Sequence, residues 1–222
     1  MGLQGCREPT LNTRLPPAHR RRIGLTGGIA TGKSRVGQLM EERGLPVLDA
    51  DAYARSALAP GSPGAEAVLH RYGPGVLMAP AGAQEPQTLD RTALGRIVFA
   101  DPVERRWLEQ LVHPIVRSRL ESELRRQANA PNVVLMVPLL FETGMDGLCS
   151  EVWLVDCDEI QQRQRLMARD GLSESEAQAR IAAQWPLERK RPLASLVIDN
   201  RGLPNALATQ VEQALRIPLR RP

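Results

Sequence analysis

Short, continuous apolar runs alternate along this 222-residue chain with segments whose apolar residues recur at helical spacing. Runs that are apolar throughout are typical of strands buried on both faces of a parallel sheet. Helices between such strands indicate parallel β-α-β units. We therefore predict an α/β fold with a five-stranded parallel sheet in a three-layer core. The predicted strands are Arg22–Thr26, Pro46–Asp49, Asn132–Val137, Glu151–Val155 and Leu196–Ile198.

The helical segments differ in where we expect them to lie. Helices Lys33–Arg43 and Leu203–Leu215 are expected to pack against the sheet. The all-helical stretch 53–128 is too long for one crossover and predicts an inserted region beside the sheet. Within it, a helix that begins at Asp101 has an apolar face that continues past Pro114. We expect a break there, because proline disfavours helical geometry in the residue before it.

Domain boundaries follow from the same patterns. Residues 161–192 contain a helical hairpin with Gly171 at its turn, which is the form of a closing lid. Residues 76–88 are expected to be a loop, and residues 1–20 a disordered extension without the apolar core of a signal peptide. The predicted core consists of the remaining segments, 21–52, 129–160 and 193–222.

Composition narrows the possible functions. Apolar residues make up 42% of the chain and aromatic residues 3%, so the core is mostly aliphatic. The net charge of +4 suits anionic small molecules, and the scattered arginines without interleaved aromatic residues argue against a nucleic-acid partner. No apolar run has the length of a membrane span. Three cysteines without C-x-x-C spacing indicate free thiols, so we expect a cytoplasmic protein with no membrane contact and no obligate protein partner.

The most specific motif is Gly27–Ser34, which fits G-x-x-x-x-G-K-[ST] between a predicted strand and a predicted helix. The amides of such a loop converge on phosphate oxygens at the positive end of the helix. Lys33 would contact the outer phosphates and Ser34 would ligate Mg²⁺. Of 29 basic residues only Lys33 and Lys190 are lysines, and a tight cradle suits a compact ammonium better than a flat guanidinium. The nucleotide-binding candidates are Gly28, Ile29, Ala30, Thr31, Gly32, Lys33, Ser34 and Arg35.

Charged residues elsewhere are candidates for the chemistry. Asp49 and Asp51 follow the second predicted strand, at the sheet edge where ligands bind. One of them could take the proton of an attacking hydroxyl while the other helps to hold Mg²⁺, although either could instead cap the next helix. Arg165 and Arg169 share a helix face and could neutralise the charge of a transferring phosphoryl group, unless that face is merely solvated. His113 could contact substrate, but a lone histidine is more often structural.

Several further stretches accompany the phosphate loop in a fixed order. They are Ile23–Ser34, Val47–Asp51, His113-Pro114, Val137–Glu142, Arg165–Asp170, Ala183-Gln184 and Val197–Asn200. In this order, over about residues 21–215, the chain resembles the dephospho-CoA kinase family. The Asp-Ala-Asp, Pro-Leu-Leu-Phe-Glu and Ile-Asp-Asn elements carry more of this resemblance than the widely shared phosphate loop. The resemblance implies a P-loop NTPase core like that of nucleoside-monophosphate kinases, a helical CoA-binding region at 53–128 and a helical lid at 161–192.

The resemblance also implies a reaction: ATP and Mg²⁺ would phosphorylate the ribose 3′-hydroxyl of dephospho-CoA in the last step of CoA synthesis. Asp51 would be the general base, Arg165 or Arg169 would belong to the lid, and Asn200 would lie near the adenine. Ala30 replaces a glycine that the family often has, which is tolerable only if its φ is negative. The candidates for substrate binding are Asp49, Asp51, His113, Leu139 and Glu142, and those for metal binding are Ser34 and Asp49.

Three other functions share part of this pattern. Another small P-loop kinase would differ only in its acceptor, and the large helical insertion favours a bulky one. A GTPase switch needs an N-K-x-D guanine motif, and the chain contains no Asn-Lys pair. A regulatory nucleotide-binding protein would release ADP from ATP without phosphorylating any acceptor.

Overall fold

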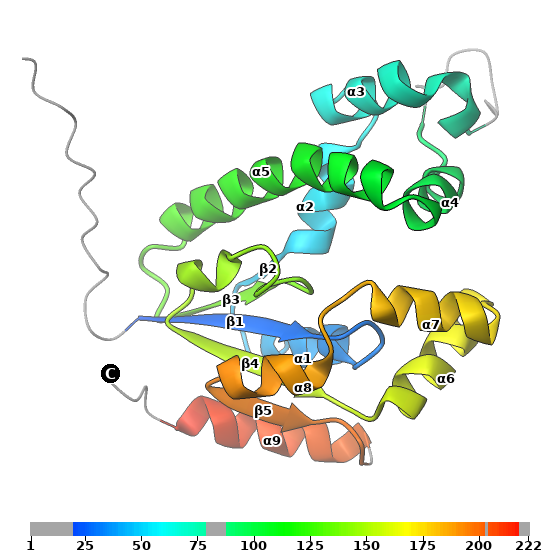
Figure 1. The fold of residues 1–222 in the computed structure, drawn as a ribbon. Coiled ribbons are helices and arrows are strands. Elements are labelled where there is room, and N and C mark those ends of the chain that lie inside the picture. Colours follow the sequence, from blue (N-terminus) through cyan, green and yellow to red (C-terminus); the bar gives the residue numbers. More distant parts are fainter. Residues whose placement is uncertain (1–19, 79–87, 203, 218–222) are drawn as a thin grey trace, which may run out of the picture.

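The structure is a computed structural model that describes residues 20–78, 88–202 and 204–217. Five parallel strands form one sheet in the order β2-β3-β1-β4-β5 (Figure 1). This confirms the predicted sheet, and each strand end lies within one residue of its prediction. The strands are β1 (Arg21–Gly27), β2 (Val47–Asp49), β3 (Asn132–Met136), β4 (Glu151–Asp156) and β5 (Leu196–Asp199).

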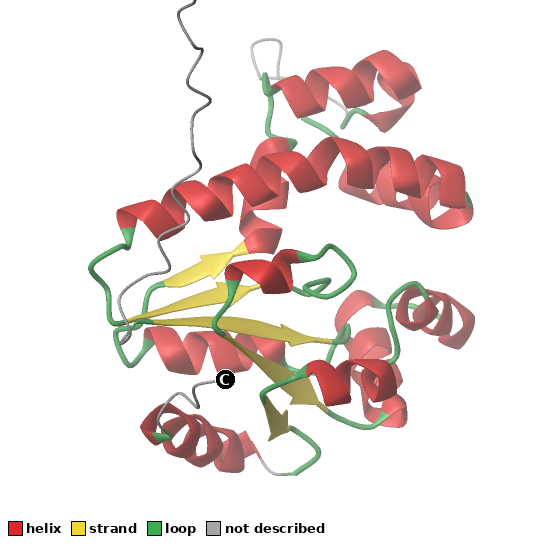
Figure 2. Ribbon diagram, turned by 60° about the vertical axis from the view of Figure 1, so that its left-hand side comes forward, coloured by secondary structure: helices red, strands yellow, loops and turns green. Residues whose placement is uncertain are grey.

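Helices α1 (Lys33–Glu41) and α9 (Pro204–Arg216) cover one face of the sheet (Figure 2). Their apolar residues form one core with the inward residues of β1, β3, β4 and β5. Trp153 of β4 is fully buried in this core, and its indole N–H donates to Glu151 at 3.0 Å. The core is otherwise aliphatic, as the low aromatic content predicted.

Helices α2 (Ala50–Ala57) and α5 (Pro102–Arg126) cover the other face, together with the short 3-10 helix η2 (Met145–Leu148). The predicted break at Pro114 is wrong, because α5 runs through it as one 25-residue helix. Proline removes one helical hydrogen bond and crowds the preceding turn. The buried Val112 and Val116 on either side of Pro114 pack into the core of this face, and this packing holds the helix together across the missing bond.

A second helical layer lies beyond α5. Helices α3 (Pro63–Tyr72), η1 (Gly73–Val76) and α4 (Arg91–Ala100) share a core of their own. These helices agree with the predicted helical stretch 53–128. Of the loop expected at 76–88, residues 79–87 lie outside the described residues, as do residues 1–19 of the expected extension.

A helical hairpin follows β4. It consists of α6 (Glu159–Asp170) and α7 (Glu174–Ala182), and the short helices α8 (Leu187–Lys190) and η3 (Arg191–Leu193) lead from it into β5. Gly171 ends α6 in the left-handed conformation, and Ser173 with Glu176 forms a capping box at the start of α7. Among the described helices, none is both long enough and apolar enough to cross a membrane.

Candidate active site

The phosphate loop connects the end of β1 to the start of α1. Thr31 is fully buried and its Oγ1 donates to Gly28 O at 2.9 Å, while Asn200 Nδ2 donates to Thr31 O at 2.7 Å. Gly32 has a φ of 95°, and a Cβ atom there would lie 2.2 Å from Asn200 Nδ2. Glycine is therefore required at position 32 both for the backbone and for the approach of Asn200. In the structure the side-chain amide of Asn200 supports the phosphate loop. Its place near the adenine of a bound nucleotide stays a prediction.

Ala30 corrects one expectation from the sequence. Its φ is 59°, and it is the one non-glycine residue with positive φ in the described part of the chain. We expected alanine to be tolerated only with negative φ. The left-handed conformation costs a residue with a Cβ atom roughly 1–2 kcal/mol, so the surrounding contacts must hold the loop in this shape.

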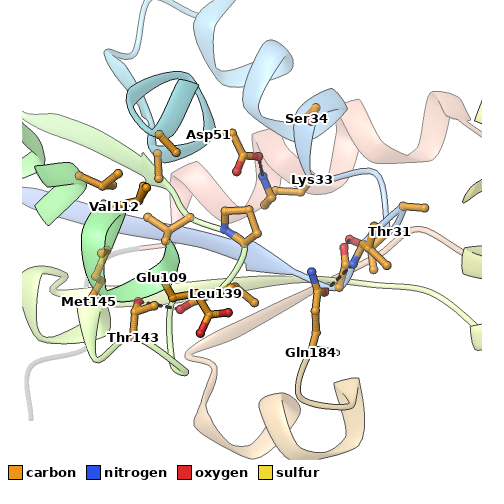
Figure 3. Close-up of a pocket in the computed structure, with 18 of the residues that line it drawn as sticks. Thr31, Lys33, Ser34, Asp51, Glu109, Val112, Leu139, Thr143, Met145 and Gln184 are labelled. Atoms are coloured by element: carbon orange, nitrogen blue, oxygen red, sulfur yellow. Dashed lines mark hydrogen bonds and ion pairs between the residues drawn. The ribbon is translucent and has the colours of Figure 1, made fainter. Parts of the chain in front are cut away.

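A cavity of about 690 Å³ opens beside the loop, between the sheet edge, α2, α5 and α6 (Figure 3). It is lined by the phosphate loop and by an apolar wall. Of the candidate site residues, the cavity brings together Gly28, Ile29, Ala30, Thr31, Gly32, Lys33, Ser34, Asp51, His113, Leu139, Arg165 and Arg169. The apolar wall includes Ala54, Leu58, Leu108, Val112, Val116 and Met145.

Lys33 and Asp51 face each other at the mouth of this cavity, with Lys33 Nζ 3.9 Å from Asp51 Oδ2 (Figure 3). Burial lowers the pKa of Lys33, and the carboxylates of Asp51 and Asp49 partly oppose this shift. Burial raises the pKa of Asp51, against the opposing effect of Lys33. A carboxylate with a raised pKa is a stronger base than an ordinary aspartate, which is the property that a proton acceptor needs.

The two aspartates after β2 have different surroundings. Asp49 Oδ1 accepts the backbone N–H of Asp51 at 2.8 Å and caps α2, and its Oδ2 lies 3.6 Å from Arg55 Nη2. Asp49 is thus a helix cap, which was one of the two roles considered for it. Asp51 lies in the first turn of α2, where it lines the cavity, and it does not cap the helix.

Helix α6 brings two arginines to the cavity. Arg165 Nη2 donates to Asn200 O at 3.0 Å, whereas its Nη1 is buried with no hydrogen-bond partner among the described residues. A buried guanidinium nitrogen of this kind suits an anionic ligand in the cavity. Arg169 Nε donates a hydrogen bond to Asp170 Oδ1 at 2.7 Å, and this hydrogen bond raises the pKa of Arg169. Arg163 of the same helix lies near Glu174 of α7, at 3.2 Å.

Four of the candidates are placed outside the cavity lining. One is Asn200, whose side-chain amide bonds the phosphate loop at Thr31 O. Arg35 is exposed and bonds Gln38 at 2.9 Å, and Asp49 caps α2 as described. Glu142 forms a buried ion pair with Lys190, with 2.7 Å between Oε1 and Nζ. The sequence contained one signal for this pair, since Lys190 is the second of only two lysines in an arginine-rich chain.

The site fits a nucleotide with a magnesium ion. The close packing at Gly28 and Gly32 leaves no room for a Cβ atom at these two positions of the loop, and Arg165 offers an unpaired donor. In the described ranges, no group of three or more His, Cys, Asp or Glu residues is arranged so that it could hold a metal ion by itself. Magnesium usually takes few protein ligands and completes its shell with phosphates and water, so Ser34 beside such a loop agrees with this preference.

A parallel sheet whose first strand leads through a G-x-x-x-x-G-K-S loop into a helix, with arginines from a helical hairpin at the same cavity, defines a P-loop kinase. The model of the dephospho-CoA kinase family matches residues 21–205. The chain therefore belongs to the dephospho-CoA kinase family, which confirms the resemblance found in the sequence.

Two relatives that are named dephospho-CoA kinase agree with this assignment, and two solved structures have a similar fold. Dephospho-CoA kinase of Synechococcus sp. (strain CC9605) is 59% identical over 201 residues, covering 90% of this chain and 95% of the relative. Dephospho-CoA kinase of Prochlorococcus marinus (strain MIT 9313) is 59% identical over 192 residues, covering 86% and 93%. The crystal structure of TT1252 from Thermus thermophilus is 40% identical, with a TM-score of 0.71 and coverage of 90% and 100%. Dephospho-CoA kinase from Campylobacter jejuni supports the fold alone, at 24% identity, a TM-score of 0.62 and coverage of 88% and 95%.

Proposed function

We propose that this kinase transfers the terminal phosphoryl group of ATP to the ribose 3′-hydroxyl of dephospho-CoA, giving CoA and ADP in the last step of CoA synthesis. Family membership supports the substrates. The observation that carries the proposal for this chain is the Lys33–Asp51 pair, because it sets a phosphate-binding ammonium 3.9 Å from a carboxylate of raised pKa at one cavity.

In the proposed mechanism each residue has one task. The loop amides and Lys33 hold the phosphates of ATP, and Asp51 takes the proton of the 3′-hydroxyl as its oxygen attacks the terminal phosphorus. The bond from phosphorus to the bridging oxygen breaks, and that oxygen leaves with ADP. Arg165 and Arg169 neutralise the charge on the transferring group.

The proposed magnesium ligands are Ser34 and Asp49, as the sequence suggested. The ion, when bound, offsets negative charge on the phosphates. Asp49 already accepts the Asp51 amide through Oδ1, so its contribution would come from Oδ2, which now lies near Arg55. Ser34 lies on the cavity wall at the start of α1.

The apolar wall of the cavity suits the larger substrate. It is formed by α2 and α5, which lie largely in the helical region 53–128, and by the segment after β3. His113 is half-buried there, and burial lowers its pKa, which favours the neutral imidazole. A neutral imidazole has one nitrogen that donates and one that accepts a hydrogen bond, so it can bind an uncharged part of the proposed substrate.

An acceptor screen tests the proposal. The enzyme is incubated with ATP, Mg²⁺ and one of dephospho-CoA, a set of nucleoside monophosphates or shikimate, and the products are identified by mass spectrometry and phosphorus NMR. We expect phosphate on the 3′-oxygen of dephospho-CoA alone. Phosphorylation of a nucleoside monophosphate instead, or release of ADP with no phosphorylated acceptor, would refute the proposal in favour of the other functions considered.

A further inference from the structure

Two glutamine side chains form hydrogen bonds with the same residue of the phosphate loop, one with its backbone N–H and one with its carbonyl oxygen. The backbone N–H of Ile29 donates to Gln184 Oε1 at 2.8 Å, and Ile29 O accepts from Gln162 Nε2, also at 2.8 Å. Figure 3 shows Gln184 reaching the loop from the segment that follows α7. The peptide groups on both sides of Ile29 are therefore fixed by side chains that lie far away in the sequence.

The two glutamines stand at the two ends of the helical hairpin. Gln162 lies in the first turn of α6, and Gln184 lies just after the end of α7. The two helices are tied to each other, for example by Gln178 Nε2, which donates to Glu159 Oε1 at 2.9 Å. Ile29 of the phosphate loop is thus bonded to the hairpin at two places, the start of its first helix and the end of its second helix.

The loop has a conformation that needs such support. Ala30, the residue after Ile29, has a φ of 59°, which residues with a Cβ atom avoid. Strained backbone of this kind persists where its neighbours over-determine it. Gln162 is buried, and a Cβ atom on Gly28 would lie 2.3 Å from its Nε2. The loop is therefore closely packed against Gln162 at Gly28, the residue before Ile29.

We propose that Gln162 and Gln184 are positioning residues that clamp Ile29, keep Ala30 left-handed and so hold the loop in its ATP-binding shape. The proposal rests on the proposed use of ATP. The N–H of Ile29 is committed to Gln184, so Ile29 does not offer its amide to the phosphates in this proposal. Gln162 also precedes Arg165 by one turn of α6, so the clamp sets the distance between the loop and the arginines of the hairpin.

The test uses the full chain and the variant Gln184→Leu, since Gln184 is only half-buried. Calorimetry gives the Kd for a non-hydrolysable ATP analogue with Mg²⁺, and steady-state kinetics give KM for ATP and for dephospho-CoA. Loss of one hydrogen bond to the loop is expected to weaken the analogue and raise the KM for ATP by about five- to tenfold. The KM for dephospho-CoA is expected to stay within about twofold.

A matched variant controls for general damage to the hairpin. Gln178→Leu makes the same substitution on α7 and breaks the bond to Glu159 without touching the loop, so the Kd is expected to stay at the wild-type value. Gln162→Leu should act like Gln184→Leu, and thermal unfolding of each variant shows whether it is folded. If Gln162→Leu fails to fold, Gln184→Leu still decides the question.

A substitution at Ala30 distinguishes loss of the clamp from a general loss of rigidity in the hairpin. Glycine adopts positive φ about as readily as negative φ. In an Ala30→Gly background the loop needs less support, so Gln184→Leu should then weaken analogue binding less than about threefold. Equal weakening in both backgrounds, an unchanged Kd in Gln184→Leu, or equal increases in both KM values would each overturn the clamp.

The outcomes for the clamp and for the proposed function are separable. If the wild-type enzyme binds the ATP analogue but does not phosphorylate dephospho-CoA, the proposed function fails while the binding data still decide the clamp. If the acceptor screen succeeds and Gln184→Leu binds the analogue like wild type, only the clamp fails.

Discussion

The buried ion pair between Lys190 and Glu142 allows the sharpest prediction about stability. Lys190 is fully buried, and its Nζ lies 2.7 Å from Glu142 Oε1 and 3.3 Å from the carbonyl oxygen of Pro138. The same Oε1 accepts the backbone N–H of Trp185 at 3.1 Å. The pair therefore ties the segment after the helical hairpin to the loop after β3.

The perturbation is Lys190→Met, which keeps most of the aliphatic stem and removes the charge. Glu142 would then be a largely buried carboxylate, 13% exposed, with the N–H of Trp185 as its remaining partner and no partner at Oε2 among the described residues. Removing one member of a buried pair costs about 3–5 kcal/mol. In a chain of this length that corresponds to a fall in Tm of roughly 10 °C.

The assay is urea unfolding followed by circular dichroism, with two companion variants. Glu142→Gln added to Lys190→Met removes the uncompensated charge and still accepts from Trp185, so it should restore about 2 kcal/mol or more. The matched control is Arg117→Met, which breaks an exposed pair with Glu121 on α5 and should cost less than about 0.5 kcal/mol.

Two results would refute this reasoning. One is a loss of less than about 1 kcal/mol in Lys190→Met, which would mean that Glu142 finds solvent or another partner. The other is a double variant no more stable than Lys190→Met alone, which would mean that the loss comes from packing and not from the charge of Glu142.

Four further predictions concern the cavity. Asp51→Asn should lower kcat by about 10²-fold or more with ATP binding retained, and near-normal turnover would remove Asp51 as the base. Because Asp51 acts when ionised and its pKa is raised, kcat/KM of the wild type should fall with decreasing pH at a pH above the ordinary aspartate range; the same acidic limb in Asp51→Asn would contradict this. Lys33→Met should weaken ATP binding roughly 10- to 100-fold by calorimetry, and unchanged binding would count against the phosphate loop. Arg165→Leu should lower kcat about 10²-fold, whereas Arg163→Leu, which faces Glu174, should change it less than about threefold; equal effects would place the role of Arg165 outside phosphoryl transfer.

Much of the fold was accessible from local patterns. The five apolar runs predicted the strands to within one residue, because strands buried on both faces need continuous apolar residues. The start of α5 at Asp101-Pro102 followed from a side chain that bonds a nearby backbone amide. The break expected at Pro114 was wrong, because core contacts of the neighbouring valines outweighed a local preference.

The site was predicted in part. Its loop, Asp51 and the arginines Arg165 and Arg169 do lie at one cavity, and the family assignment is confirmed. The sequence left open which of Asp49 and Asp51 caps α2, and it gave no role to Gln162. These answers depend on which backbone amide or carbonyl each side chain reaches, and such partners are set by the packing of whole elements.

Local sequence patterns were enough to predict the succession of strands and helices along the chain, the phosphate loop and the family, because each depends on residues that are adjacent or regularly spaced in the chain. The left-handed φ of Ala30, the burial of Lys190 against Glu142 and the hydrogen bonds of two glutamines to Ile29 became known only from the folded structure. Burial, charge pairing and backbone strain depend on surroundings that distant segments create only when the chain has folded.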